Sequence, residues 1–239
     1  MSLKSTCIAL AGTAVLALSA PATAEDDAEK LGVTNPAAYL MPEAEEIALS
    51  RSAAIDAVSA NASVLVLQSD GSYKTAVEGS NGWTCFTGRS WTGPAAYKDG
   101  KRAWGENHFN PAARAPQCFN AAATSSILKW HRITTWHFMQ GASIDEVDQA
   151  VGRAVETGKI KPPRPGAMSY MHSPKQVLAP DGGRFHPHVM LYTPYATQES
   201  YGTGNPAKGI PLLTDGGSIF ATTVILSPNW SDGTPATGH

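Results

Sequence analysis

Residues 63–87 read SVLVLQSDGSYKTAVEGSNGWTCFT, and this stretch decides the fold class because it has the pattern of short strands joined by tight turns. A β-branched and apolar run at 64–67 is followed by a glycine-containing turn and by a second run at 73–77 with alternating polarity. Another glycine-containing turn leads to a third run at 83–87. Turns of this kind at this spacing predict a three-stranded antiparallel meander.

The stretch from 120 to 157 predicts two helices that pack as a hairpin. Asn120 can cap the first helix, and Gly141 suits the left-handed position just after its end. Ser143 opens the second helix with a capping box. The second helix carries an apolar stripe at helical spacing, which we expect to be buried: Ile144, Val147, Val151, Ala154 and Val155.

Strand patterns return in the C-terminal third of the chain. The segments 167–172, 188–193 and 218–226 are rich in apolar, aromatic or β-branched residues, and turn-rich connections separate them. A short amphipathic helix is predicted at 42–58. Strands, then helices, then strands predict an α+β domain with a mainly antiparallel sheet, an αα-hairpin packed on one face and a long disulfide-closed loop.

The N-terminus has the three-part pattern of a secretory signal peptide. Lys4 supplies a positive charge, residues 8–18 form an apolar run too short to span a bilayer, and Ala22-Thr23-Ala24 is a cleavage site. The expected organisation is a signal peptide at 1–24, a flexible leader at 25–41, a single α+β domain at 42–226 and a disordered tail at 227–239. We therefore expect a periplasmic or secreted protein.

Composition narrows the expected partners. The chain has 239 residues and a formal net charge of −2, and it contains no basic cluster, so nucleic acid and anionic membranes are poor candidates. No apolar stretch after the signal is long enough to span a membrane. A small molecule or a component of the cell envelope is the expected partner.

Cysteine usage predicts one disulfide. Cys7 leaves with the signal peptide, so Cys85 and Cys118 are the two thiols of the mature chain, and in an oxidising compartment they are expected to pair. The alternative is that Cys85 is a nucleophile activated by a histidine.

Residues 88–117 show almost no periodicity and predict a long irregular loop pinned at its base by that disulfide. Two of its aromatic residues, Trp91 and Trp104, are candidates for ligand contact through ring stacking. The alternative is that they anchor the loop by ordinary packing.

Three histidines form the candidate metal site. His186 and His188 are two apart, so in an extended segment both point to the same side, and His172 ends the preceding strand. If these strands pair, the three rings resemble a zinc site with an open position. The alternative is that the histidines bond loop backbone, with His188 largely buried, His186 more exposed and no cofactor bound.

Several short motifs taken together resemble a group of exported bacterial proteins. They are Asn81-Gly82-Trp83-Thr84-Cys85, Pro116-Gln117-Cys118-Phe119, Arg164-Pro165-Gly166-Ala167-Met168 and Pro187-His188-Val189-Met190-Leu191-Tyr192. The resemblance runs from about Val64 to Ile225 and implies one coherent domain, but no particular reaction, cofactor or catalytic residue.

The sequence contains no G-x-S-x-G elbow and no Walker-type lysine loop. The expected function is a non-catalytic binding or structural role in the cell envelope. The alternative is a metal-dependent hydrolase that uses His172, His186 and His188.

Overall fold

A computed structural model describes residues 32–92, 96–98, 101–103, 106–178, 183–201 and 211–236. The expected signal peptide and residues 25–31 of the expected leader lie outside this part of the chain.

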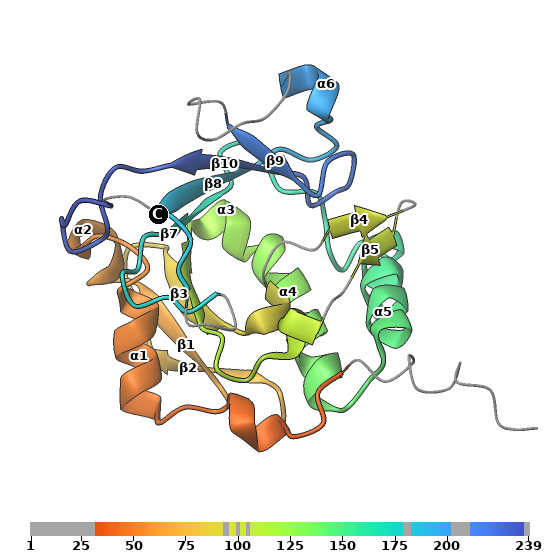
Figure 1. Cartoon of the computed structure of the whole chain (residues 1–239), viewed down its shortest axis with the longest axis horizontal. Coiled ribbons are helices and arrows are strands. Elements are labelled where there is room, and N and C mark those ends of the chain that lie inside the picture. The colour runs from red at the N-terminus through yellow and green to blue at the C-terminus, as the bar shows by residue number, and fades with distance from the viewer. Residues whose placement is uncertain are drawn as a thin grey trace, which may run out of the picture. The chain divides into compact units, whose positions relative to one another are not determined.

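An eight-stranded sheet with the order β2-β1-β3-β6-β7-β8-β10-β9 forms the centre of the fold (Figure 1). Its strands are β1 (Ser63–Leu67), β2 (Tyr73–Val77), β3 (Thr84–Gly88), β6 (Ala115–Phe119), β7 (Met168–Met171), β8 (His188–Tyr192), β9 (Leu212–Thr214) and β10 (Thr222–Leu226). All neighbouring pairs are antiparallel except β1 and β3. The predicted combination of helices with a mainly antiparallel sheet is therefore confirmed.

The predicted three-stranded meander is wrong, because β3 pairs in parallel with the other edge of β1. Between β2 and β3 the chain crosses the start of β1, where the Gly79 N–H donates to Ser63 Oγ at 3.0 Å. A Cβ on Gly79 would lie 2.1 Å from the Ser63 nitrogen, so glycine is what permits this close crossing. In the sequence, a turn at this position looks the same whichever edge the next strand joins.

The helix predicted at 42–58 is two separate helices, α1 (Glu43–Arg51) and α2 (Asp56–Ser59). The chain turns between them, and Ile55 is extended at the start of α2 with 46% of its surface exposed. α1 buries Glu46 and Ser50 rather than an apolar stripe. Its buried face is therefore polar, which the predicted periodicity did not indicate.

The predicted caps after Phe119 are present. Asn120 Oδ1 accepts a hydrogen bond from the Ala123 nitrogen at 3.0 Å and so caps α3 (Ala121–Thr124). The chain then breaks briefly before α4 (Ile127–Met139). Gly141 has a φ of 78°, and Ser143 forms the predicted capping box of α5 (Ile144–Glu156).

α4 and α5 contact each other. On α5 the side chain of Val147 is 1% exposed, which confirms its predicted burial. Ile144, Val151 and Val155 are half-buried and pack against the core cluster. Ala154 is also buried, at 6% exposed, so two members of the predicted stripe are buried and three are half-buried.

The two faces of the sheet have different partners. The inner face carries Phe86 and Phe119, whose rings lie 5.5 and 5.7 Å from the ring of His131 on α4. The outer face carries Thr87, whose Oγ1 lies 2.8 Å from Ser50 Oγ on α1. Alternation along each strand therefore sets which side chains face α4 and which face α1.

Both ends of the described domain pack more tightly than the sequence predicts. In the expected leader, η1 (Pro36–Tyr39) places Tyr39 in the core with 3% of its surface exposed. In the expected tail, Trp230 is 6% exposed, and Ser231 Oγ donates to the Ser52 carbonyl at 2.6 Å. The sequence predicted a flexible leader and a disordered tail, whereas the described residues 32–41 and 227–236 include side chains that are buried in the domain.

The connection between β3 and β6 contains regular elements within the predicted irregular loop. They are η2 (Ser90–Thr92), the paired strands β4 (Ala96–Lys98) and β5 (Lys101–Ala103), and η3 (Glu106–Phe109). At its base, Cys85 and Cys118 are opposite each other on β3 and β6 with Cα atoms 4.0 Å apart and form a disulfide. The predicted bond is confirmed, and both cysteines are fully buried.

Among the described residues, no helix combines the length and the apolar character needed to cross a bilayer.

Candidate functional site

A cavity of about 450 Å³ lies against the inner face of the sheet. Strand alternation supplies its floor, because Gln117, Met171, Met190 and Val224 all occupy inner-face positions of adjacent strands. The walls come from α4 and from residues in the segments 89–92, 108–113 and 183–185, together with Leu178. Most of the lining is apolar or aromatic, as is usual for small-molecule sites.

The α4 wall presents Trp130 and His131 to the cavity. Trp130 stacks on Phe220 with ring centroids 4.7 Å apart, and it lies 4.7 Å from the ring of His131. The same imidazole stacks on Phe119 of the inner face of the sheet. These contacts fix both rings, so the wall is rigid and largely aromatic.

Tyr192 forms the inner end of β8 and lines the cavity. Its hydroxyl lies 2.7 Å from Ser169 Oγ, which is fully buried on the neighbouring strand. Burial raises the pKa of Tyr192, so the phenol stays protonated at neutral pH.

His188 is the titratable group whose protonation the geometry defines best. Its Nδ1 lies 2.7 Å from the carbonyl oxygen of His186, and a carbonyl can only accept, so Nδ1 carries the proton. Burial lowers the pKa of His188 to about 4, which leaves the ring neutral at pH 7. Nε2 of this cavity-lining ring is therefore a hydrogen-bond acceptor.

Arg89 lines the cavity but is committed to neighbouring groups. Its guanidinium donates to Glu46 Oε1 at 2.9 Å, while Nε donates to the Tyr39 carbonyl at 2.7 Å and Nη1 donates to the Thr87 carbonyl. Arg89 and Glu46 are both fully buried. Burial raises the pKa of the Glu46 carboxyl, and the Arg89 charge opposes that effect.

Arg184 and Phe185 are the exposed members of the cavity lining. Phe185 is 37% exposed, and its ring lies edge-on to His188 with centroids 5.1 Å apart. Arg184 lies over the ring of Trp230 at 5.2 Å and donates to the Pro174 carbonyl at 3.0 Å. An apolar ring therefore sits between solvent and the buried imidazole.

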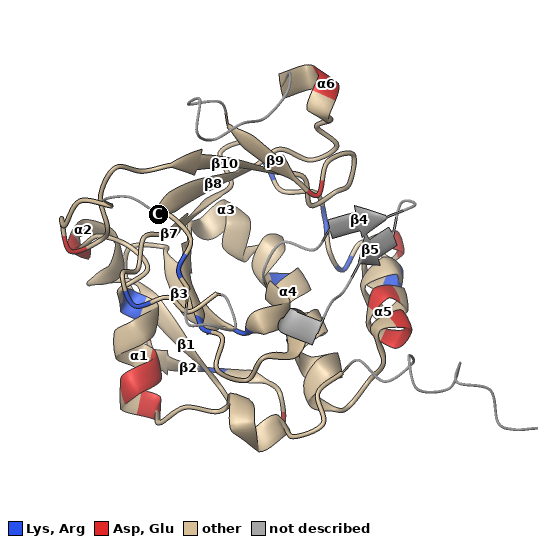
Figure 2. Ribbon diagram, in the orientation of Figure 1, with Lys and Arg blue, Asp and Glu red and all other residues tan. Residues whose placement is uncertain are grey.

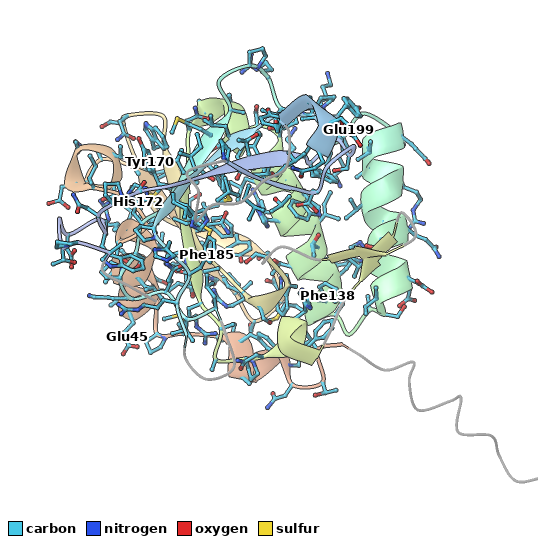
Figure 3. All side chains as sticks on the ribbon, turned by 45° about the horizontal axis from the view of Figure 1, so that its top comes forward. Glu45, Phe138, Tyr170, His172, Phe185 and Glu199 are labelled. Carbon is cyan, nitrogen blue, oxygen red and sulfur yellow. A yellow bond between two sulfur atoms is a disulfide. The ribbon has the colours of Figure 1, made fainter. Side chains whose placement is uncertain are left out.

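The structure does not bring the three predicted metal-ligand histidines to a common point. The Nε2 atom of His172 lies 2.9 Å from Ser227 Oγ, and its ring lies 5.0 Å from Tyr170 (Figure 3). Among the described residues, no three His, Cys, Asp or Glu side chains are placed to hold a metal ion. His188 is 5% exposed and His186 is half-buried, the order of exposure expected for the alternative reading.

The structure describes one of the two loop tryptophans that were candidates for ligand contact. Trp91 is fully buried, and its Nε1 donates to Thr135 Oγ1 at 2.9 Å. This side chain therefore anchors the loop in the core. Trp104 lies outside the described residues.

The sequence analysis missed His131 and the pair formed by Arg89 and Glu46. Helical spacing could have found His131, because it lies on the same face of α4 as Thr135 and Phe138, which are also buried. No local pattern identifies the ion pair, since its two members come from α1 and from the end of β3, far apart in the chain.

Comparison of the chain with protein-family models, with curated proteins and with solved structures finds no match.

Proposed function

We propose that the protein is a non-catalytic binding protein of the cell envelope, whose inner-face cavity holds a small and mostly apolar ligand. The observation that carries this proposal is the cavity of about 450 Å³ with an apolar floor and a stacked aromatic wall. This volume is within the usual range for small-molecule sites, roughly 300–1,000 Å³.

The buried imidazole of His188 favours a ligand that carries a hydrogen-bond donor. Because Nδ1 is bonded to the His186 carbonyl, Nε2 can accept one hydrogen bond from a ligand. A ligand with an N–H or O–H donor can pair with this nitrogen, so such a ligand is favoured over a pure hydrocarbon.

A binding role without catalysis is favoured because polar side chains that line the cavity bond to neighbouring groups of the protein. The Arg89 guanidinium bonds Glu46, and the Tyr192 hydroxyl lies beside Ser169 Oγ. The metal-dependent hydrolase is the weaker alternative, since the described side chains of His172 and His188 each contact other groups.

Export of the protein from the cytoplasm is part of the same proposal. The signal-like residues 1–24 and the buried disulfide suit an oxidising compartment outside the cytoplasm.

The proposal also includes the helical hairpin. In this hairpin, α4 forms the cavity wall and α5 supports it from behind, with Val147 of α5 buried in the core.

A neutral fluorescent amine tests the proposal. N-phenyl-1-naphthylamine is apolar and carries one N–H donor, and we expect saturable binding of one probe per chain with quenching of tryptophan emission. Its N-methylated analogue, which lacks the donor, should bind several-fold more weakly, because one buried hydrogen bond contributes about 1 kcal/mol. Failure of both probes to saturate the protein would refute the proposal.

A further inference from the structure

A second concave site lies between α4 and α5, away from the cavity. It is a groove of about 810 Å³ whose lining residues include Lys129, Arg132, Trp136, Arg153 and Lys159. On α4, Trp130 and His131 face the cavity, whereas the side chains that line the groove are on the other side of the helix. The two sites therefore share a helix but no lining residue.

The groove is positively charged. Its lining contains the four cations Lys129, Arg132, Arg153 and Lys159 and no aspartate or glutamate. In the described part of the chain the ion pairs are those of Lys74 with Glu43 and Arg89 with Glu46, so none of the four cations belongs to one. This concentration of charge stands out in a protein of net charge −2.

The acidic residues of α5 are not among the residues that line the groove. Figure 2 shows both acidic and basic segments on α5 and a basic segment on α4. Glu146 accepts from the nitrogen and hydroxyl of Ser143 at 2.8 and 2.9 Å, and Asp148 also has a partner. Asp145 and Glu156 are exposed and do not line the groove.

The pKa of His137, which lines the groove, depends on the charges around it. Its pKa is lowered, chiefly by burial, and then by the positive charges of Arg153 and Lys159, with Glu146 opposing. The two cations from α5 and from the segment after it therefore act on the same point of α4.

An exposed indole lies within the groove. Trp136 is 46% exposed, and its ring lies edge-on to His137 with centroids 4.9 Å apart. The face of an indole is electron-rich and attracts polarised C–H groups, so it suits the flat apolar face of a sugar ring. Arginine pairs with carboxylates through two parallel hydrogen bonds, and lysine supplies further point charge.

We propose that the groove between α4 and α5 binds a carboxylate-bearing oligosaccharide, with its acid groups on Arg132 and Arg153 and a sugar ring on Trp136. The groove has a volume of about 810 Å³, and the protein as a whole lacks the net positive charge typical of nucleic-acid binding. This site is separate from the cavity, so each proposal can fail without the other.

Calorimetric titration of the full mature chain with hexagalacturonate tests the assignment, with maltohexaose as the neutral control of the same length. We expect saturable binding of the acidic hexamer, weakening as salt is raised, and no measurable binding of maltohexaose. The double variant Arg132→Gln/Arg153→Gln should weaken binding at least about tenfold, because two charge-assisted pairs are lost. The charge-matched control Arg164→Gln/Lys175→Gln removes two exposed cations that do not line the groove, and it should bind like the wild type.

Trp136→Ala separates the stacking contribution, since it leaves all charges in place and should weaken binding several-fold even in high salt. Equal binding of the two hexasaccharides, or equal losses in the groove and control double variants, would overturn the proposal. Tighter binding of a hexathymidylate than of hexagalacturonate would also overturn it, in favour of a nucleic-acid site.

Discussion

The imidazole of His188 donates from Nδ1 to the carbonyl oxygen of His186, two residues earlier in the chain, at 2.7 Å. Pro187 between them is buried, so the turn that leads into β8 sets the orientation of the ring. One backbone carbonyl thereby fixes both the tautomer of a buried histidine and the acceptor that faces the cavity.

Stability should fall with acidification through His188. Burial lowers its pKa from 6.5 to about 4, with the His172 and His186 charges adding to this effect and the hydrogen bond to His186 opposing it. The unfolded chain binds this proton below pH 6.5, but the folded chain binds it only near pH 4. The free energy of unfolding should therefore decrease between these limits, by up to roughly 3 kcal/mol. Urea unfolding at pH 7 and 4.5 should show a smaller decrease in His188→Gln; equal decreases in both proteins would refute this role.

The buried pair of Arg89 and Glu46 should matter far more than the exposed pair of Lys74 and Glu43. Arg89→Met leaves the carboxylate of Glu46 buried and uncompensated, which should cost about 3–5 kcal/mol of unfolding free energy. Lys74→Met breaks a pair whose side chains are about half exposed, and it should cost less than about 1 kcal/mol. Chemical denaturation measures both variants. Similar losses would mean that the buried pair is not the stronger constraint.

A buried position of α5 should tolerate charge less well than a half-buried position one turn further along the helix. Val147 is 1% exposed, so Val147→Asp should cost several kcal/mol by placing an unpaired charge in the core. Val151 is half-buried and lies one turn further along, so Val151→Asp should cost clearly less, because its carboxylate can reach water. Thermal melts of the two variants check the order, and the reverse order would mean that the helix face is misassigned.

Ser227 should not behave as a hydrolase nucleophile, although its Oγ lies 2.9 Å from Nε2 of His172. Burial lowers the pKa of His172, but among the described residues no carboxylate is bonded to its ring. Its neighbour Met171 faces the cavity, so His172 points to the other side of the sheet. A fluorophosphonate probe should leave the wild type unlabelled while it labels a serine hydrolase in the same mixture. Stoichiometric labelling that disappears in Ser227→Ala would support an enzyme.

The elements that could be predicted from the sequence are those that depend on interactions between residues close together in the chain. The caps at Asn120 and Ser143 and the strand at 188–192 depend on residues within a few positions of one another. The parallel pairing of β1 with β3 depends instead on a crossing at Gly79 against Ser63, a contact between segments that the pattern treats separately.

The candidate site was harder to predict for the same reason. Its floor combines inner-face positions of the four strands β6, β7, β8 and β10, which are spread between residues 115 and 226, and no single stretch reveals that they share a cavity. The histidine motif did lead to His188, but the bond to His186 gives it a role different from metal binding. The disulfide could be predicted because Cys85 and Cys118 were the sole thiols left to pair after the signal peptide.

The most direct test of the central claim compares two neighbouring positions on β10. Val224 lines the cavity, whereas Ile225 is on the opposite face and is 41% exposed, so phenylalanine at each position adds the same bulk on different sides of the sheet. Titration with N-phenyl-1-naphthylamine should show affinity reduced at least about tenfold in Val224→Phe and unchanged in Ile225→Phe. Should Val224→Phe lower the melting temperature, Met190→Phe fills the same cavity from β8 and should have the same effect on binding. Wild-type affinity in the two cavity variants, or an equal loss in Ile225→Phe, would contradict a ligand site on the inner face.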